Sequence, residues 1–103
     1  MTSPLAELVT YGGETLTDRS ATIAGVGALM AANNYRRGFF IQNINATTDL
    51  WVNFLGGTAA AGTPGSIRLG PYDAYESPLG GASLAAVSVS GAPAGHIITA
   101  WEY

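Results

Sequence analysis

The sequence contains no cysteine and no lysine, and it has a single histidine. The absence of cysteine excludes disulfide bonds, thiolate metal sites and a cysteine nucleophile. The four basic residues are all arginines, and against seven acidic residues they leave a formal net charge of −3. Nucleic acids and acidic membrane surfaces are both bound through clusters of lysine and arginine, so we expect neither kind of partner.

Charged residues and long apolar runs are also scarce. Only 11% of the residues are charged, compared with about 25% in average soluble domains. So few charges favour a protein that is packed against copies of itself or against another surface. No segment approaches the ~20 consecutive apolar residues of a membrane helix. Residues 1–10 lack the basic and apolar regions of a secretory signal, so we expect no Sec targeting.

The length of 103 residues fits one domain with one core. Residues 1–20 show no clear period, and we expect an irregular N-terminal arm that is either docked on a neighbour or frayed. Residues 21–103 contain short alternating segments, frequent turn signals and no helical period. They predict a single all-β domain, a small antiparallel β-sandwich or barrel of jelly-roll or immunoglobulin-like type, with six or seven short strands.

The clearest strand signal lies in residues 38–45, where Phe39, Ile41 and Asn43 share one face. Residues 49–54 resume the alternation after a short polar connection, so the two segments are expected to pair as a hairpin, with Asn53 facing outward. Further strands are expected over residues 14–16, 21–32, 66–69, 73–76, 85–90 and 96–102, with a turn over 91–95 and a loop over 55–65 that is either flexible or a contact loop.

Side chains that support catalysis are few. His96 has no second histidine or cysteine with which to build a transition-metal site, and we expect it to be a polar residue at a strand start. No Gly-x-Ser-x-Gly nucleophile elbow is present. Asp73 and Glu76 are three residues apart on an expected strand, so they face opposite sides and do not act as a pair. We predict a protein that is not an enzyme and has no cofactor or metal.

Other side chains suit contacts with a partner. Arg36 and Arg37 precede the clearest strand, and adjacent positions point to opposite faces. One of them can therefore cover the sheet edge while the other reaches outward to an acidic group. Protection of the sheet edge alone is the favoured interpretation. Aromatic side chains suit both protein interfaces and sugar stacking. The candidate contact residues are Arg36, Arg37, Trp51, Tyr72, Tyr75 and Trp101.

Two segments, residues 34–43 and 49–54, resemble a pattern that recurs in small structural proteins of tailed bacteriophages. The pattern is an arginine, a strand ending in Ile-Gln-Asn, a short polar turn and a second strand of the type Leu-x-Val-Asn-Phe. Residues 66–71 and 99–103 resemble later parts of the same pattern. The resemblance implies a β-rich virion component without catalytic residues, such as a capsid decoration (cement) protein or the base of a head fibre.

The resemblance and the composition lead to the same expectation. The chain is expected to be a non-enzymatic phage protein that is made in the host cytoplasm and decorates the capsid exterior. There it would bind the major capsid protein as a homo-oligomer, with a trimer favoured, and stabilise the shell. The alternative is a carbohydrate-binding module of the tail or a fibre, which uses Trp51, Tyr72 or Tyr75 as stacking rings. Symmetric assembly favours the first expectation, and saturable sugar binding favours the second.

Overall fold

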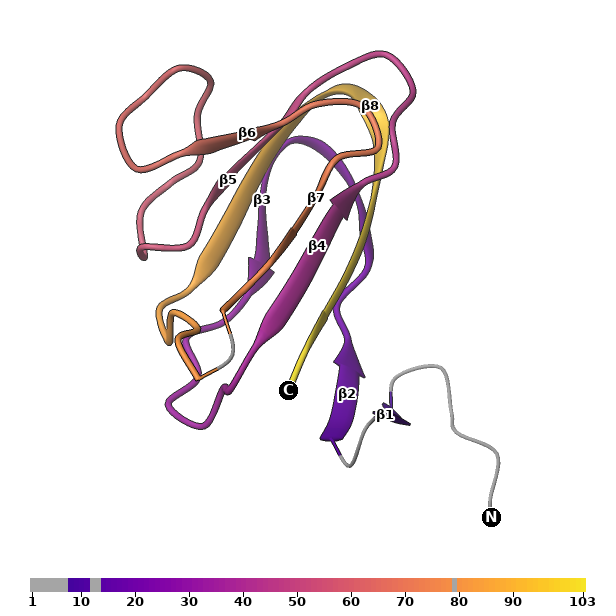
Figure 1. The fold of residues 1–103 in the computed structure, drawn as a ribbon. Helices are drawn as coiled ribbons and strands as arrows, with labels where there is room; N and C mark the ends of the chain where they lie inside the picture. Colours follow the sequence, from indigo (N-terminus) through magenta and orange to yellow (C-terminus); the bar gives the residue numbers. More distant parts are fainter. Residues whose placement is uncertain (1–7, 12–13, 79) are drawn as a thin grey trace.

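The computed structural model describes residues 8–11, 14–78 and 80–103 (Figure 1). No helix among these residues is long and apolar enough to cross a membrane. Every strand pairing in the described part is antiparallel, and the expected all-β architecture is confirmed. The strands are β1 (Leu8–Tyr11), β2 (Glu14–Asp18), β3 (Ala21–Met30), β4 (Phe39–Asn43), β5 (Leu50–Asn53), β6 (Ile67–Leu69), β7 (Ala74–Glu76) and β8 (Val87–Glu102).

The 16-residue strand β8 organises the sheet, because β2, β3, β4 and β5 all pair with it. Figure 1 shows β8 rising along the molecule, bending at the top and descending to the C-terminus, with β3 following the same bend. The first half of β8 pairs with β5, and β6 extends that layer. The second half pairs with β4, and β7 extends the other layer. The bend therefore joins the two layers of a sandwich.

The turn expected over residues 91–95 is wrong, because these residues lie within β8 rather than between two strands. Both flanks of the segment pair with β3, and residues 92–95 stand opposite the single residue Ala24. Gly25 and Gly95 take φ angles of +82° and +84°, which glycine adopts without the steric cost of a Cβ atom. The glycines and the proline of this segment thus belong to a large bulge that bends the strand. The same residue types are common in turns, which is why the sequence indicated one.

The expected hairpin between residues 38–45 and 49–54 is also wrong. Both segments are strands, but β4 and β5 pair with successive parts of β8 and not with each other. The connection between them is held by side chains: Asn45 Oδ1 accepts from the backbone N–H groups of Thr47 and Thr48, each at 2.8 Å. These bonds stabilise a corner at which the chain passes from one layer to the other. As a result, β4 and β5 each pair with the long strand β8 instead of with each other.

The N-terminal arm and the loop after β5 both contact β8. The expected N-terminal arm includes β1 and β2, which pair with each other, and β2 joins the sheet through Thr17 and Asp18. Residues 1–7, 12 and 13 of the arm lie outside the described residues. The loop that follows β5 folds back over the sheet, where Ala59 is buried and its N–H donates to Ser88 Oγ at 2.7 Å. That loop is therefore anchored at its middle.

The core lies between the two layers and confirms the alternation expected for β4, and the end of β8 alternates in the same way. In β4, Phe39, Ile41 and Asn43 are buried while the residues between them are half-buried. Asn53, expected to face outward, is buried, and its Oδ1 accepts from the N–H of Leu55 at 2.8 Å. The apolar core consists of Leu29, Met30, Phe39, Ile41, Leu50, Val52, Leu69, Val87, Val89, Ile98 and Ala100.

Candidate functional site

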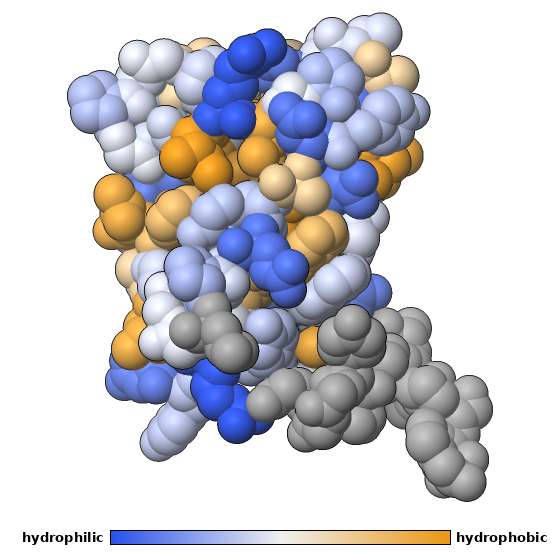
Figure 2. Space-filling view, viewed as in Figure 1, coloured by the Kyte–Doolittle hydropathy of each residue, from blue (hydrophilic) through white to orange (hydrophobic). Residues whose placement is uncertain are grey.

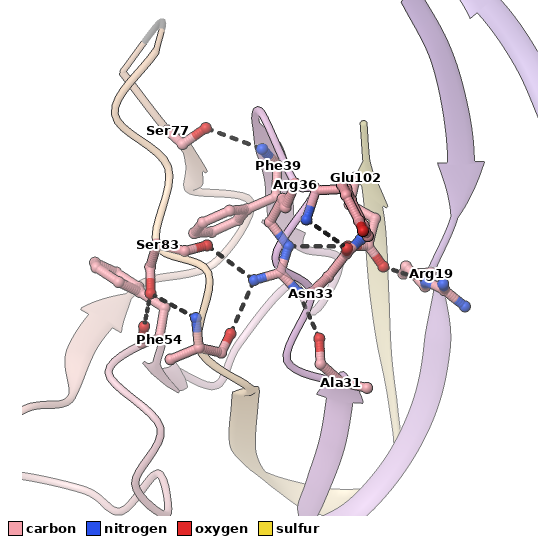
Figure 3. A network of polar contacts seen from close by, with 11 residues as sticks. Arg19, Ala31, Asn33, Arg36, Phe39, Phe54, Ser77, Ser83 and Glu102 are labelled. Atoms are coloured by element: carbon pink, nitrogen blue, oxygen red, sulfur yellow. Dashed lines mark hydrogen bonds and ion pairs between the residues drawn. The ribbon is translucent and has the colours of Figure 1, made fainter.

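Arg36 lies at the centre of a buried polar network (Figure 3). Its side chain is fully buried, and its Nε donates to Glu102 Oε1 at 2.9 Å. Its Nη1 donates to the carbonyls of Ser83 and Ala85 at 2.9 and 2.8 Å, and its Nη2 donates to the carbonyl of Ala31 at 2.7 Å. The expectation that Arg36 contacts a partner is corrected, because its guanidinium group is committed to hydrogen bonds inside the chain.

Glu102 accepts hydrogen bonds from three side chains of the same network. Besides Arg36, Arg19 Nε donates at 2.6 Å and Asn33 Nδ2 at 3.3 Å. Burial raises the pKa of Glu102, but the hydrogen bonds from Arg36, Arg19 and Asn33 outweigh it, and the pKa lies below its ordinary value. A buried carboxylate that stays ionised and is saturated with donors acts as a structural tie. A glutamate on the inward face of a strand is seldom buried without a partner, so its position in the sequence predicts a buried basic side chain beside it.

His96 and Asn43 form a second buried polar pair. His96 is completely buried, and its Nε2 lies 2.6 Å from Asn43 Oδ1. The Asn43 amide nitrogen donates to three backbone carbonyls at 2.9 to 3.0 Å, those of Thr48, Leu69 and Gly70. These bonds orient the amide, so the histidine Nε2 is the donor of the pair. His96 was expected at a strand start, but it lies inside β8, where it holds the bulge.

The described residues contain no group of three histidine, aspartate or glutamate side chains that is arranged to hold a metal ion. The acidic residues instead serve local structure. Asp73 Oδ2 accepts from the N–H of Gly70 at 3.0 Å and closes the turn before β7. Asp18 Oδ1 accepts from the N–H of Ser20 at 2.9 Å, and this bond lowers the pKa of Asp18.

A groove of about 310 Å³ opens beside Trp51 on the outer face of the β5–β8 layer. Strand register places Arg68, Trp51, Ser90 and Val26 in one row across β6, β5, β8 and β3. Arg68 Nε donates to Asp49 Oδ2 at 2.8 Å, and this bond raises the pKa of Arg68. The residues that line the groove are Gly25, Thr48, Asp49, Trp51, Ala61, Ser90, Gly91 and Ala92.

A second surface, which we call the end surface, carries exposed apolar side chains at the opposite end of β5. The segments that bear them are tied together: Asn33 N–H donates to the Leu84 carbonyl at 2.9 Å, and Ser83 Oγ donates to the Phe54 carbonyl at 2.5 Å. Figure 3 shows these segments converging around Arg36. The end surface consists of Tyr35, Leu55 and Leu84, which are 90%, 67% and 44% exposed.

The two tryptophans among the candidate residues do not share one surface. Trp51 pairs with Ser90 in the first half of β8 and faces the groove. Trp101 lies in the second half, where its ring stacks on Phe40 with centroids 4.4 Å apart.

The remaining candidate residues are also dispersed. Tyr75 packs against the core, stacked on Phe54 at 5.1 Å, and is not a free ring. Tyr72 is 57% exposed with a φ of +62°, and Arg37 is exposed beside the buried Arg36. A single stacking platform of Trp51, Tyr72 and Tyr75 is therefore not formed.

Both surfaces depend on contacts between distant segments. Sequence reasoning singled out only Trp51 among the residues that compose them, although the loop over residues 55–65, expected to be either flexible or a contact loop, contains Leu55 and Ala61. Tyr35, Leu55 and Leu84 carry no pattern that distinguishes them from core residues, since each is a large apolar side chain next to a turn. Comparisons of the chain with protein-family models, with curated proteins and with solved structures give no match.

Proposed function

We propose that this protein is a non-enzymatic structural component of a bacteriophage virion. It decorates the outside of the capsid, binds the major capsid protein and stabilises the shell. The end surface is the observation that carries the proposal, because three large apolar side chains are presented to solvent on segments that the fold holds together. Apolar groups exposed in this way suit contact with another protein. The resemblance of residues 34–43 and 49–54 to phage structural proteins supports the same role.

The rigidity of the end surface also favours docking. Arg36 donates to the carbonyls of Ala31, Ser83 and Ala85, so it braces the segments that carry Tyr35 and Leu84. Loops that are ordered before binding lose less conformational entropy when a partner arrives. A buried arginine that ties these segments together therefore improves the affinity of a surface that it does not itself reach.

The rest of the exterior fits a protein that is packed in an assembly. Figure 2 shows orange side chains reaching the surface at several places, separated by white and pale blue residues. A stable interface buries about 800 Å² on each partner, and the whole chain exposes 5850 Å². Contacts of this size with a capsid protein, and with two further copies in the favoured trimer, lower the free energy of the assembled shell relative to its separated subunits.

Shell binding tests the proposal directly. Capsids of the phage assembled without this protein are mixed with the purified chain, sedimented and heated. We expect saturable co-sedimentation and a higher disruption temperature of the shell. The double variant Tyr35→Ser/Leu84→Ser should lose most of the binding, while Val26→Ser, which removes an apolar group that is 58% exposed outside the end surface, should retain it. Shells with an unchanged disruption temperature would exclude the stabilising role.

A further inference from the structure

We propose that the groove beside Trp51 binds one neutral pyranose ring of a saccharide. This site is separate from the end surface and does not rest on the virion role. The groove lies at the start of β5, and the end surface follows the end of the same strand. Its volume of about 310 Å³ is at the lower limit of ligand pockets, which range over roughly 300–1,000 Å³. A space of this size suits one sugar ring rather than an extended chain.

Trp51 gives the groove an apolar wall in a fixed position. The residue is half-buried, and strands hold it from both sides, since it pairs with Arg68 on β6 and with Ser90 on β8. An indole offers a large flat apolar area and loses little conformational freedom on binding. The C–H face of a pyranose ring is complementary to such a wall.

Polar groups stand beside this apolar wall. Asp49 Oδ2 accepts from Arg68, but Asp49 Oδ1 accepts no hydrogen bond from the described residues, and its side chain is 34% exposed. A carboxylate oxygen is a strong acceptor for a sugar hydroxyl. Thr48 Oγ1 is the one buried side-chain polar atom of the described part that lacks a partner. Thr48 also lines the groove, but its Oγ1 is shielded, so the acceptor that the groove presents to a ligand is Asp49 Oδ1.

Charge and space in the groove define the class of sugar. The only charged lining residue is the acidic Asp49, and the Nε of its neighbour Arg68 is already engaged by it. The charge of Asp49 is balanced within this pair, so a neutral ring needs no further counter-charge and is preferred over a charged one. The wall at Gly25 is open, because a Cβ added there would meet no atom within 4 Å. The other small wall residues, Ala61 and Ala92, are exposed and leave an entrance.

Tryptophan fluorescence tests the site, because the chain has only two tryptophans. Trp101→Phe leaves Trp51 as the single reporter, and Trp51→Phe leaves Trp101 as the matched control. Each variant is titrated with methyl glucoside, methyl galactoside, N-acetylglucosamine, glucuronate and sorbitol. We expect a saturable change for at least one neutral pyranoside in the Trp51 reporter and none in the Trp101 reporter. Glucuronate should bind at least about fivefold more weakly, and sorbitol should give no saturation.

Two further variants show whether binding takes place in the groove. Ala61→Met narrows the entrance and Asp49→Asn removes the charged acceptor, so each should weaken binding by roughly tenfold. Ala46→Met, an equally exposed alanine outside the groove, should leave binding unchanged. Amide NMR shifts of the unaltered protein give an independent measurement. Sugar-dependent shifts should concentrate at Trp51, Ser90 and Ala92.

The outcomes separate this site from the virion role. The proposal is overturned if no neutral pyranoside saturates the Trp51 signal and the NMR shifts, or if Ala61→Met binds as well as Ala46→Met. The double variant Tyr35→Ser/Leu84→Ser should bind sugar normally, because the end surface shares no residue with the groove. If this double variant loses shell binding but still binds sugar, the loss is caused by the end surface alone and leaves the proposal for the groove intact.

Discussion

Arg36 Nε donates to Glu102 Oε1 across 2.9 Å, with the two side chains only 0% and 4% exposed. This ion pair joins the turn after β3 to the last residue of β8, 66 positions further along the chain. Because the same guanidinium group also donates to three backbone carbonyls, one side chain fixes the C-terminus of the sheet and the loops of the end surface. Four predictions follow from this and related contacts.

Arg36→Met should lower the free energy of unfolding by about 3–5 kcal/mol, because it leaves the buried Glu102 without its main partner. Three backbone carbonyls also lose their donor. Urea denaturation followed by circular dichroism measures the effect. Arg68→Met removes an ion pair at the surface, with side chains 61% and 34% exposed, and should lower the free energy of unfolding far less, because solvent screens such a pair. Equal costs for the two variants would contradict a structural role for the buried pair.

Acid should destabilise the protein through Glu102. The pKa of this carboxyl in the folded protein lies below its ordinary value of 4.5, so the folded state binds the proton less readily than the unfolded state. Its stabilisation is therefore complete above about pH 4.5 and is lost as the pH falls through the lower folded-state pKa. Urea midpoints measured from pH 7 to pH 3 should fall on the acid side.

Glu102→Gln should flatten this acid limb, because the variant has no proton to gain at that position. Asp18→Asn is the control, since Asp18 also has a lowered pKa but is exposed, and among the described residues its carboxylate is bonded only to Ser20. It should change the slope of the limb far less. An acid limb that stays as steep in Glu102→Gln as in the unaltered protein would rule out Glu102 as its source.

Asn43→Leu should cost about 3 kcal/mol, because it strips His96 Nε2 of its acceptor and removes the donor shared by three buried carbonyls. Asn45→Ala removes only the turn bonds of the β4–β5 connection and should cost about 1 kcal/mol. Thermal and urea unfolding of both variants tests the difference. A cost for Asn43→Leu below that of Asn45→Ala would argue against the buried pair.

Gly91→Ala should be destabilising by about 1–3 kcal/mol, because the added Cβ would lie 2.6 Å from His96 Nδ1. Gly91→Ala should cost less when it is made in the His96→Ala variant, because the obstructing imidazole ring is absent there. A double-mutant cycle of the two substitutions measures the coupling between positions 91 and 96. Gly62→Ala is the comparison: nothing lies within 4 Å of its Cβ, and only its φ of +67° is unfavourable, at about 1 kcal/mol. Additive costs at positions 91 and 96 would contradict the clash.

Local pattern was sufficient to predict the existence and facing of several strands. Alternation puts Phe39 and Ile41 on one face of residues 38–45, and Ile98 and Ala100 on one face of residues 96–102, and all four are buried. This works because successive side chains of a strand point to opposite faces whatever its partner is. The β-branched residues of the glycine-containing segment 21–32 likewise favoured a strand or a bulged strand, and β3 is a strand with two register shifts.

Strand pairing was not predictable in the same way. Residues 91–95 have turn composition, and residues 38–54 have hairpin spacing, yet both belong to a sheet that is organised by the long β8. A glycine-rich segment can reverse the chain or form a bulge within a strand, and it forms a bulge when both of its flanks pair with the same strand. Here that strand is β3, which lies more than 60 positions earlier in the sequence. Local sequence carries no information about such a partner.

The sequence by itself determined an all-β chain without disulfides and with few charges. Only the tertiary structure decided that Arg36 rather than Arg37 turns inward, because the choice depends on Glu102, which lies 66 residues away. The groove and the end surface were decided in the same way, since each is assembled from segments that are separate in the chain. Alternation follows from the geometry of one strand, whereas a surface follows from packing between strands.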